Sequence, residues 1–82
     1  MNEYAKELGE VLKTFDVQKL RHFILEHWDM YRHLTAPELI NDDSWLKGCM
    51  AKMILARIDM PDDLREKAKE VLDELGWDYE IY

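Results

Sequence analysis

Four side chains spaced along residues 16–34 are of types that bind metal ions. His22 and Glu26 are four residues apart, and Asp29 and His33 are four residues apart as well. Imidazole and carboxylate groups are suitable ligands for zinc-like ions. The two histidines are eleven residues apart, which is about 16 Å along a helix, so they cannot share one ion. Because each pair then supplies only two ligands, we expect solvated side-chain pairs here and no metal site.

A third histidine and the single cysteine are the other candidates for reactive groups. His27 lies on the apolar side of the same predicted helix, between Phe23 and Met30, where a histidine can donate or accept a proton. No serine or cysteine is paired with it, so we expect a structural histidine whose ring bonds to a carbonyl or a tyrosine hydroxyl. Cys49 falls among apolar residues without a base on the same face, and we expect a small core residue rather than a nucleophile.

The sequence lacks the short motifs that accompany common catalytic and cofactor sites. It contains no P-loop, no dinucleotide-binding glycine pattern, no G-x-S-x-G, no H-E-x-x-H and no C-x-x-C. A chain of 82 residues also has little material to enclose a substrate pocket. We therefore expect a protein that is not an enzyme, with no cofactor, no metal and no small-molecule substrate. The competing hypothesis is a small metalloprotein or enzyme that uses the histidines of residues 16–34.

Charge is distributed unevenly along the chain. Eighteen acidic and eleven basic residues give a net charge of −7, and residues 59–82 contain nine of the acids against three bases. Residues 44–58 contain three bases and no acid, but these bases point in different directions around one helix. The chain as a whole repels phosphate, so we expect no nucleic-acid binding. We interpret the acidic segment as a solubilising face; the alternative is an inhibitor or immunity-type protein that docks a basic partner.

Apolar residues recur at helical spacing from one end of the chain to the other, and strand patterns are almost absent. Asp16 is a good N-cap residue, and Thr35 and Glu38 have the spacing of a capping box. Asp59 is expected to cap the last helix and Gly76 to end it. The sequence therefore predicts an all-α bundle of four main helices and one short helix, joined by short connections. The predicted helices cover residues 3–14, 16–34, 36–41, 44–58 and 60–75, followed by an extended tail over residues 77–82.

Residues 44–58 form the most apolar of the predicted helices, with ten apolar side chains among fifteen. A surface helix has an apolar stripe on one side only, whereas here apolar residues extend around the helix. Either this helix is central, with the others packed around it, or one of its faces meets a second copy or another protein. The tail is expected to pack across the helices, with addition to a partner's sheet as the alternative. The candidate partner-contact residues are Lys47, Lys52, Ile54, Leu55, Arg57, Ile58, Trp77 and Tyr79.

Location and function follow from these features as expectations. No apolar run approaches the roughly 18 residues that a membrane span requires, and residues 1–7 lack the basic and apolar regions of a signal peptide. The single cysteine cannot form a disulfide framework, which favours the cytoplasm. We expect one small acidic helical domain over residues 1–82, a regulatory or adaptor module that acts through protein–protein contacts, including a possible homodimer, and has no membrane association.

Overall fold

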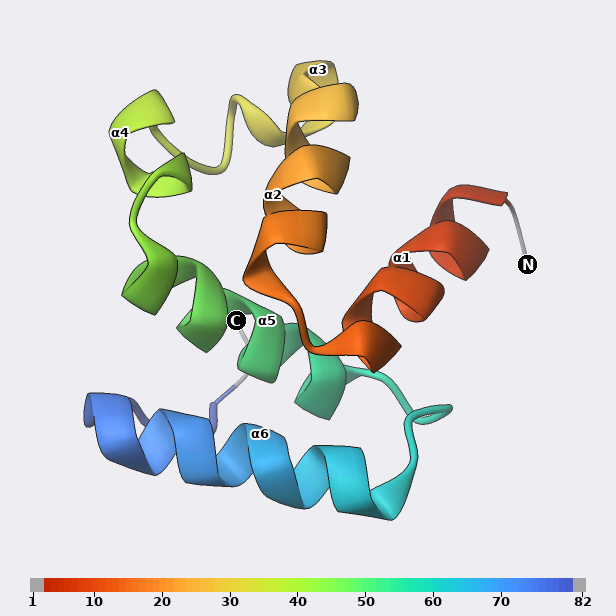
Figure 1. The fold of residues 1–82 in the computed structure, drawn as a ribbon, viewed down its shortest axis with the longest axis vertical. Coiled ribbons are helices and arrows are strands. Elements are labelled where there is room, and N and C mark those ends of the chain that lie inside the picture. Colours follow the sequence, from red (N-terminus) through yellow and green to blue (C-terminus); the bar gives the residue numbers. More distant parts are fainter. Residues whose placement is uncertain (1–2, 81–82) are drawn as a thin grey trace.

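The computed structural model describes residues 3–80 and contains six helices and no strand in that range (Figure 1). Four of the helices have ten or more residues, and two are single turns of four residues. The predicted all-α fold with four main helices is therefore confirmed, although the described residues contain two short helices instead of one. The helices are α1 (Glu3–Thr14), α2 (Val17–Glu26), α3 (Trp28–Tyr31), α4 (Pro37–Ile40), α5 (Asp43–Ala56) and α6 (Asp62–Leu75).

Helix α5 is the central helix of the molecule. It contacts α1, α2, α4 and α6, and Figure 1 shows it between α6 on one side and α1 and α2 on the other. Leu46, Met50, Ala51 and Ile54 of α5 are completely buried. This central position explains why apolar residues surround the helix, and it confirms the first of the two interpretations of residues 44–58. The helix begins one residue earlier and ends two residues earlier than predicted.

The second predicted helix, over residues 16–34, is divided in the structure. Helix α2 ends at Glu26, and His27 takes φ −113° and ψ 33° before α3 begins. The ring Nδ1 of His27 lies 2.9 Å from the carbonyl oxygen of Phe23. The Phe23 carbonyl also keeps its helical bond from the His27 N–H at 3.1 Å, and beyond His27 the N–H of Met30 donates to the His27 carbonyl at 2.9 Å. After α3 the chain turns instead of continuing the helix, so the prediction of one long helix is wrong.

Two of the predicted helix ends are confirmed by their hydrogen bonds. The carboxylate of Asp16 accepts from the backbone N–H of Gln18 at 2.9 Å, as an N-cap does. At the other end of the chain, Gly76 has φ +75° and ends α6 in the left-handed conformation. The N–H of Trp77 then donates to the carbonyl of Leu72 at 3.0 Å, which turns the tail back onto the bundle.

Two other predicted helix starts are shifted. The residue that caps α4 is Ala36, without a side-chain hydrogen bond, and the hydroxyl of Thr35 donates to the Ala36 carbonyl. The predicted capping box is therefore not formed. Helix α6 is preceded by Pro61 rather than capped by Asp59, because the Asp59 carboxylate accepts hydrogen bonds from the guanidinium of Arg57.

Candidate functional site

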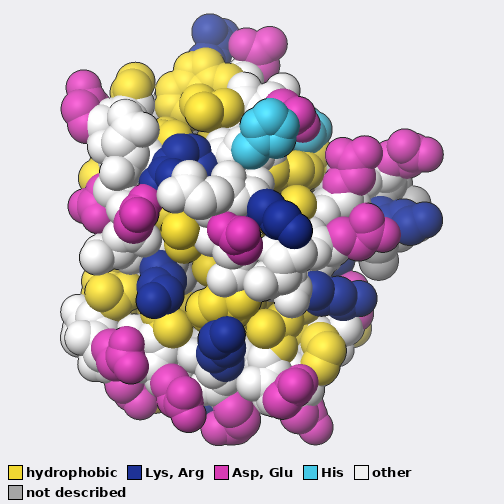
Figure 2. Space-filling model, viewed as in Figure 1, with side chains coloured by type: hydrophobic (Ala, Val, Ile, Leu, Met, Phe, Trp, Pro, Cys, Tyr) yellow, Lys and Arg dark blue, Asp and Glu magenta, His cyan; other side chains and the backbone are white. Residues whose placement is uncertain are grey.

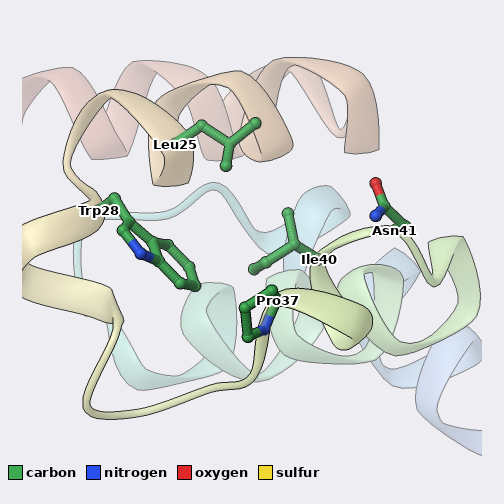
Figure 3. Close-up of a pocket in the computed structure, with 5 residues that line it drawn as sticks. All are labelled: Leu25, Trp28, Pro37, Ile40 and Asn41. Atoms are coloured by element: carbon green, nitrogen blue, oxygen red, sulfur yellow. The ribbon is translucent and has the colours of Figure 1, made fainter.

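An apolar hollow of ≈ 500 Å³ opens at the end of the molecule where α2, α3 and α4 meet. Figure 3 shows side chains from these three helices converging on the space between them. Four of the five residues that line it are apolar, and none of the five is titratable, so the hollow suits an apolar group. The lining residues are Leu25, Trp28, Pro37, Ile40 and Asn41. We refer to this feature as the α2–α4 hollow.

A charged hydrogen bond fixes the distance between the two sides of the α2–α4 hollow. The Nε–H of Arg21 on α2 donates to the carbonyl oxygen of Ile40, the last residue of α4, at 2.8 Å. The same guanidinium pairs with the carboxylate of Asp43 in the first turn of α5. Arg21 therefore satisfies a C-terminal carbonyl of α4 and ties α2 to the α4–α5 junction. These contacts within the chain hold the two sides of the hollow at a fixed distance.

Apolar side chains at this end of the molecule are unusually exposed. Leu25, at the rim of the hollow, is 55% exposed, whereas Ile40 is buried and forms its floor. Met30 and Leu34 follow within ten residues of Leu25 and are 53% and 77% exposed. Figure 2 shows apolar side chains on the surface at the end that carries α3. Of these three residues only Leu25 borders the α2–α4 hollow, because Leu34 lines a second, smaller hollow together with Trp45 and Met53. A large exposed apolar side chain at the rim of an apolar hollow is suited to contact with a partner.

Carboxylates neighbour the α2–α4 hollow along the chain. Across residues 25–43 there are five acidic residues and one basic residue, Arg32. Asp29 and Glu38 are exposed, and neither forms an ion pair within residues 3–80. The hollow is therefore an apolar site within a segment of net negative charge. The exposed carboxylates that directly follow a lining residue in the sequence are Glu26, Asp29, Glu38 and Asp42.

The predicted contact surface on α5 is partly internal. Ile54 is completely buried, so the prediction that it contacts a partner is wrong; it packs in the core because α5 is central. The Lys52 ammonium pairs with the carboxylate of Asp78 in the tail at 3.2 Å. Arg57 pairs with Asp59 at 3.0 Å. Two of the three basic residues expected to rim this surface are thus already bound to carboxylates of the same chain.

The other predicted contact residues of α5 and of the turn that follows it differ in exposure. Ile58 lies in the turn between α5 and α6 and is completely exposed, Leu55 is half-buried, and Lys47 is exposed. None of these residues lines the α2–α4 hollow, so the structure does not bring the two surfaces together at one site. Their contact with a second chain stays a prediction.

The tail packs onto its own chain as far as residue 80. The half-buried ring of Trp77 joins the core cluster and lies against Gly48 of α5. The hydroxyl of Tyr79 donates to the carboxylate of Asp73 at 2.6 Å, although the Tyr79 side chain remains 44% exposed. The expected packing of the tail is confirmed for Trp77, while Ile81 lies outside the described residues.

The histidine–carboxylate pairs do not come together into a metal site. His22 and Glu26 form an exposed pair with 2.6 Å between Nε2 and Oε1, as the helical spacing predicted. Asp29 lies on α3 and His33 in the turn after it, so the helical spacing that paired them is lost. Within residues 3–80 no three His, Cys, Asp or Glu side chains are grouped closely enough to bind a metal ion.

His27 is packed and hydrogen-bonded as a structural residue. Its Nδ1–H donates to the Phe23 carbonyl, which is one of the two kinds of partner expected. The imidazole stacks on the Phe23 ring with centroids 4.3 Å apart and meets the edge of Tyr4 at 5.2 Å. The Tyr4 hydroxyl in turn bonds to the hydroxyl of Tyr31 at 2.5 Å. The half-buried His27 therefore joins α1 to the end of α2.

Cys49 lies half-buried beside a smaller apolar hollow of ≈ 160 Å³, which it lines together with Trp45 and Met53 of the same helix. Burial raises the pKa of the Cys49 thiol to about 11, and the positive charge of Lys52 offsets only part of this effect. The thiolate is the nucleophilic form, so Cys49 is unreactive near neutral pH. This environment agrees with the expected role of a small packing residue.

Comparison with protein-family models, with curated proteins and with solved structures gives no match to this chain. Among the described residues, no helix has both the length and the apolar character needed to cross a membrane.

The apolar pattern of the sequence did not predict the α2–α4 hollow. The one sign of this site in the sequence is Leu25, a large apolar residue that lies beside Glu26 and off the apolar stripe of its helix. The spacing of Trp28 places it with the apolar side chains of residues 16–34, and Pro37 stands in the expected first turn of the helix over residues 36–41. The hollow forms because the break at His27 and the turn after α3 bring α4 back beside α2, and neither event is visible in the apolar periodicity.

Proposed function

We propose that this chain is a non-enzymatic helical domain that works by binding another protein at the α2–α4 hollow. The observation that carries the proposal is the position of Leu25. Its side chain is 55% exposed and lies at the rim of a hollow that is also lined by Trp28 and by the buried Ile40. The centres of protein interfaces are rich in aromatic and apolar side chains, and their rims are polar. The α2–α4 hollow and its neighbouring carboxylates have this composition.

The lining of the hollow favours a protein partner over a small substrate. Asn41 is its one polar lining residue, and no lining residue can serve as an acid, a base or a nucleophile. Small-molecule sites combine apolar walls with several placed polar groups that orient the ligand. An apolar anchor from a partner protein requires no such groups. We also propose a regulatory or adaptor role in the cytoplasm, because a single cysteine cannot form the disulfides that are common in secreted proteins.

Self-association is a second candidate, and the exposure of Ile58 favours it. A completely exposed isoleucine at the turn between α5 and α6 is suited to contact with a second chain. A homodimer built there would need to bury about 1,000 Å² or more in total to be stable. Light scattering at several concentrations measures it directly: a dimer at micromolar concentration that Ile58→Asp dissociates supports this candidate, and a strict monomer contradicts it.

The test of the main proposal is site-specific photo-crosslinking in the native cell. A benzophenone amino acid replaces Leu25 at the hollow, and in a matched variant it replaces the exposed Glu70 on α6. We expect discrete protein adducts from position 25 that are absent from position 70, because only the first position borders the hollow. Adducts at neither position, or the same adducts at both, would contradict a binding role for the α2–α4 hollow.

A further inference from the structure

The charge around the α2–α4 hollow restricts the chemistry of what it binds. Three nearby carboxylates are already engaged: Glu26 with His22, Asp42 as the cap that accepts from the Trp45 N–H, and Asp43 with Arg21. These interactions stay within the chain.

Asp29 and Glu38 are different, because they are exposed and form no ion pair in residues 3–80. Asp29 directly follows Trp28 and Glu38 directly follows Pro37, so each is one residue along the chain from a residue that lines the hollow. Residues 25–43 contain five acidic residues against one basic residue, Arg32, so an occupant of the apolar hollow approaches a segment of net negative charge.

The same charges argue against a second copy as the occupant. In a two-fold contact the same patch faces itself, so Asp29 and Glu38 of one copy would approach those of the other. Like charges placed opposite each other in an interface oppose binding. The net charge of −7 also opposes approach to anionic lipid and to nucleic acid. A cationic partner meets none of these penalties.

We propose that the α2–α4 hollow binds a cationic segment of a partner protein. The segment places a large apolar side chain between Leu25 and Trp28, above Ile40, and sets Lys or Arg side chains beside Asp29 and Glu38. The apolar anchor supplies most of the affinity, whereas the charge pairs set the choice of partner and the rate of association. This inference rests on the proposed function and adds the chemical class of the partner.

The experiment titrates the full isotope-labelled chain with three designed peptides of equal length. The first carries two leucines at i and i+4 and four lysines; the second replaces the lysines by glutamate, and the third replaces the leucines by alanine. We expect the first peptide to bind at least tenfold more tightly than either of the others. NMR shift changes are expected to centre on residues 25–41, including the indole N–H of Trp28, and binding is expected to weaken as salt increases.

Matched charge variants separate the rim from the general acidity of the chain. Asp29→Asn with Glu38→Gln removes two negative charges at the hollow, and Glu70→Gln with Glu74→Gln removes two from exposed positions on α6. We expect the first pair to weaken binding of the lysine–leucine peptide about fivefold and the second pair less than twofold. Equal effects of the two pairs, or shift changes centred on α6, would overturn the inference.

A third variant tests the apolar anchor, and the crosslinking experiment distinguishes the two proposals. Leu25→Ser is expected to weaken the lysine–leucine peptide at least fivefold, and unchanged affinity would count against the hollow as the binding site. If crosslinks form at position 25 while none of the peptides binds, or the glutamate peptide binds best, then the cationic-partner inference fails and the proposed function stands. If neither crosslinks nor peptide binding occur, both fail.

Discussion

The indole ring of Trp77 lies against the backbone of Gly48. A Cβ atom placed on Gly48 would come within 2.4 Å of the ring, which is far closer than van der Waals contact. Gly48 is buried in the middle of α5, where glycine disfavours helix formation relative to alanine. The glycine is therefore explained by the ring that it admits: it lets the tail close over the central helix.

Replacement of this glycine tests how firmly the tail is fixed. Gly48→Ala is expected to lower the free energy of unfolding by about 1–2 kcal/mol, because the overpacking exceeds the gain in helix propensity. Gly9→Ala is the matched control. A Cβ at Gly9 meets the Nη2 atom of Arg57 at 2.8 Å, and the end of an arginine side chain can move aside. Urea unfolding measures both variants, and a Gly48→Ala protein as stable as the wild type would contradict tight packing of Trp77.

Arg65 of α6 caps the C-terminal end of α5. Its Nη1 donates to the carbonyl of Arg57 at 2.5 Å and approaches that of Ile54 at 3.4 Å, and its Nη2 donates to the carbonyl of Leu55 at 3.3 Å. The Ile54 carbonyl already accepts from the Arg57 N–H at 3.2 Å, so Arg65 chiefly serves the carbonyls of Leu55 and Arg57. A cation near these carbonyls also interacts favourably with the helix dipole.

Removal of this capping charge is expected to be costly. Arg65→Gln should destabilise the fold by about 2–3 kcal/mol, because hydrogen bonds from a charged donor are lost and part-buried carbonyls are left without a partner. Arg65→Lys keeps the charge but not the fork of donors, so an intermediate loss is expected. The measurement is again urea unfolding. A loss of less than about 0.5 kcal/mol in Arg65→Gln would show that water satisfies these carbonyls equally well.

The fold class was predictable because local signals agreed along most of the chain. Apolar spacing, the Asp16 cap and Gly76 each depend on neighbouring residues, and these features appear in the structure as expected. The break at His27 was not predictable from periodicity, since an unbroken helix over residues 16–34 fits the same apolar pattern. At the break the His27 ring packs against Tyr4 of α1 and Phe23, and the periodicity of one segment does not reveal such contacts between helices.

The candidate site was predictable to a smaller degree. The high apolar content of residues 44–58 correctly indicated an unusual helix. Most of the apolar side chains of α5, including that of Ile54, pack in the core instead of facing a partner. The exposed apolar group belongs instead to the segment from Leu25 to Leu34, where the sequence looked like an ordinary amphipathic helix. Leu25 is exposed because it lies off the apolar stripe of α2, whereas Met30 and Leu34 come after the break at His27, where α2 no longer continues.

The raised pKa of Cys49 predicts a loss of stability at alkaline pH. The ordinary pKa of 9.0 applies to the unfolded chain, whereas the folded chain keeps the proton until about pH 11. Between these values the unfolded state releases the proton first, so the thiol's contribution to stability is full below pH 9 and is lost as pH rises toward 11. Because part of the thiol still contacts solvent, we expect a loss of about 1 kcal/mol.

The measurement compares wild type with Cys49→Ala in urea, under reducing conditions, at several pH values from 7 to 11. Every other titratable group is present in both proteins, so its effect cancels in the difference. The stability advantage of the wild type is expected to shrink as pH rises. A difference that stays constant with pH would mean that the thiol is ionised as easily in the folded chain as in the unfolded one.

The rim and the floor of the α2–α4 hollow are expected to respond differently to mutation. Leu25 is 55% exposed, so Leu25→Ser removes little buried apolar area and should cost less than about 1 kcal/mol. Ile40 is buried, and Ile40→Ala should cost about 2–4 kcal/mol because it leaves a cavity in the core. Thermal unfolding followed by circular dichroism measures both. If Leu25→Ser melts as early as Ile40→Ala, then Leu25 supports the fold rather than a binding surface, and the large exposed side chain beside the hollow needs another explanation.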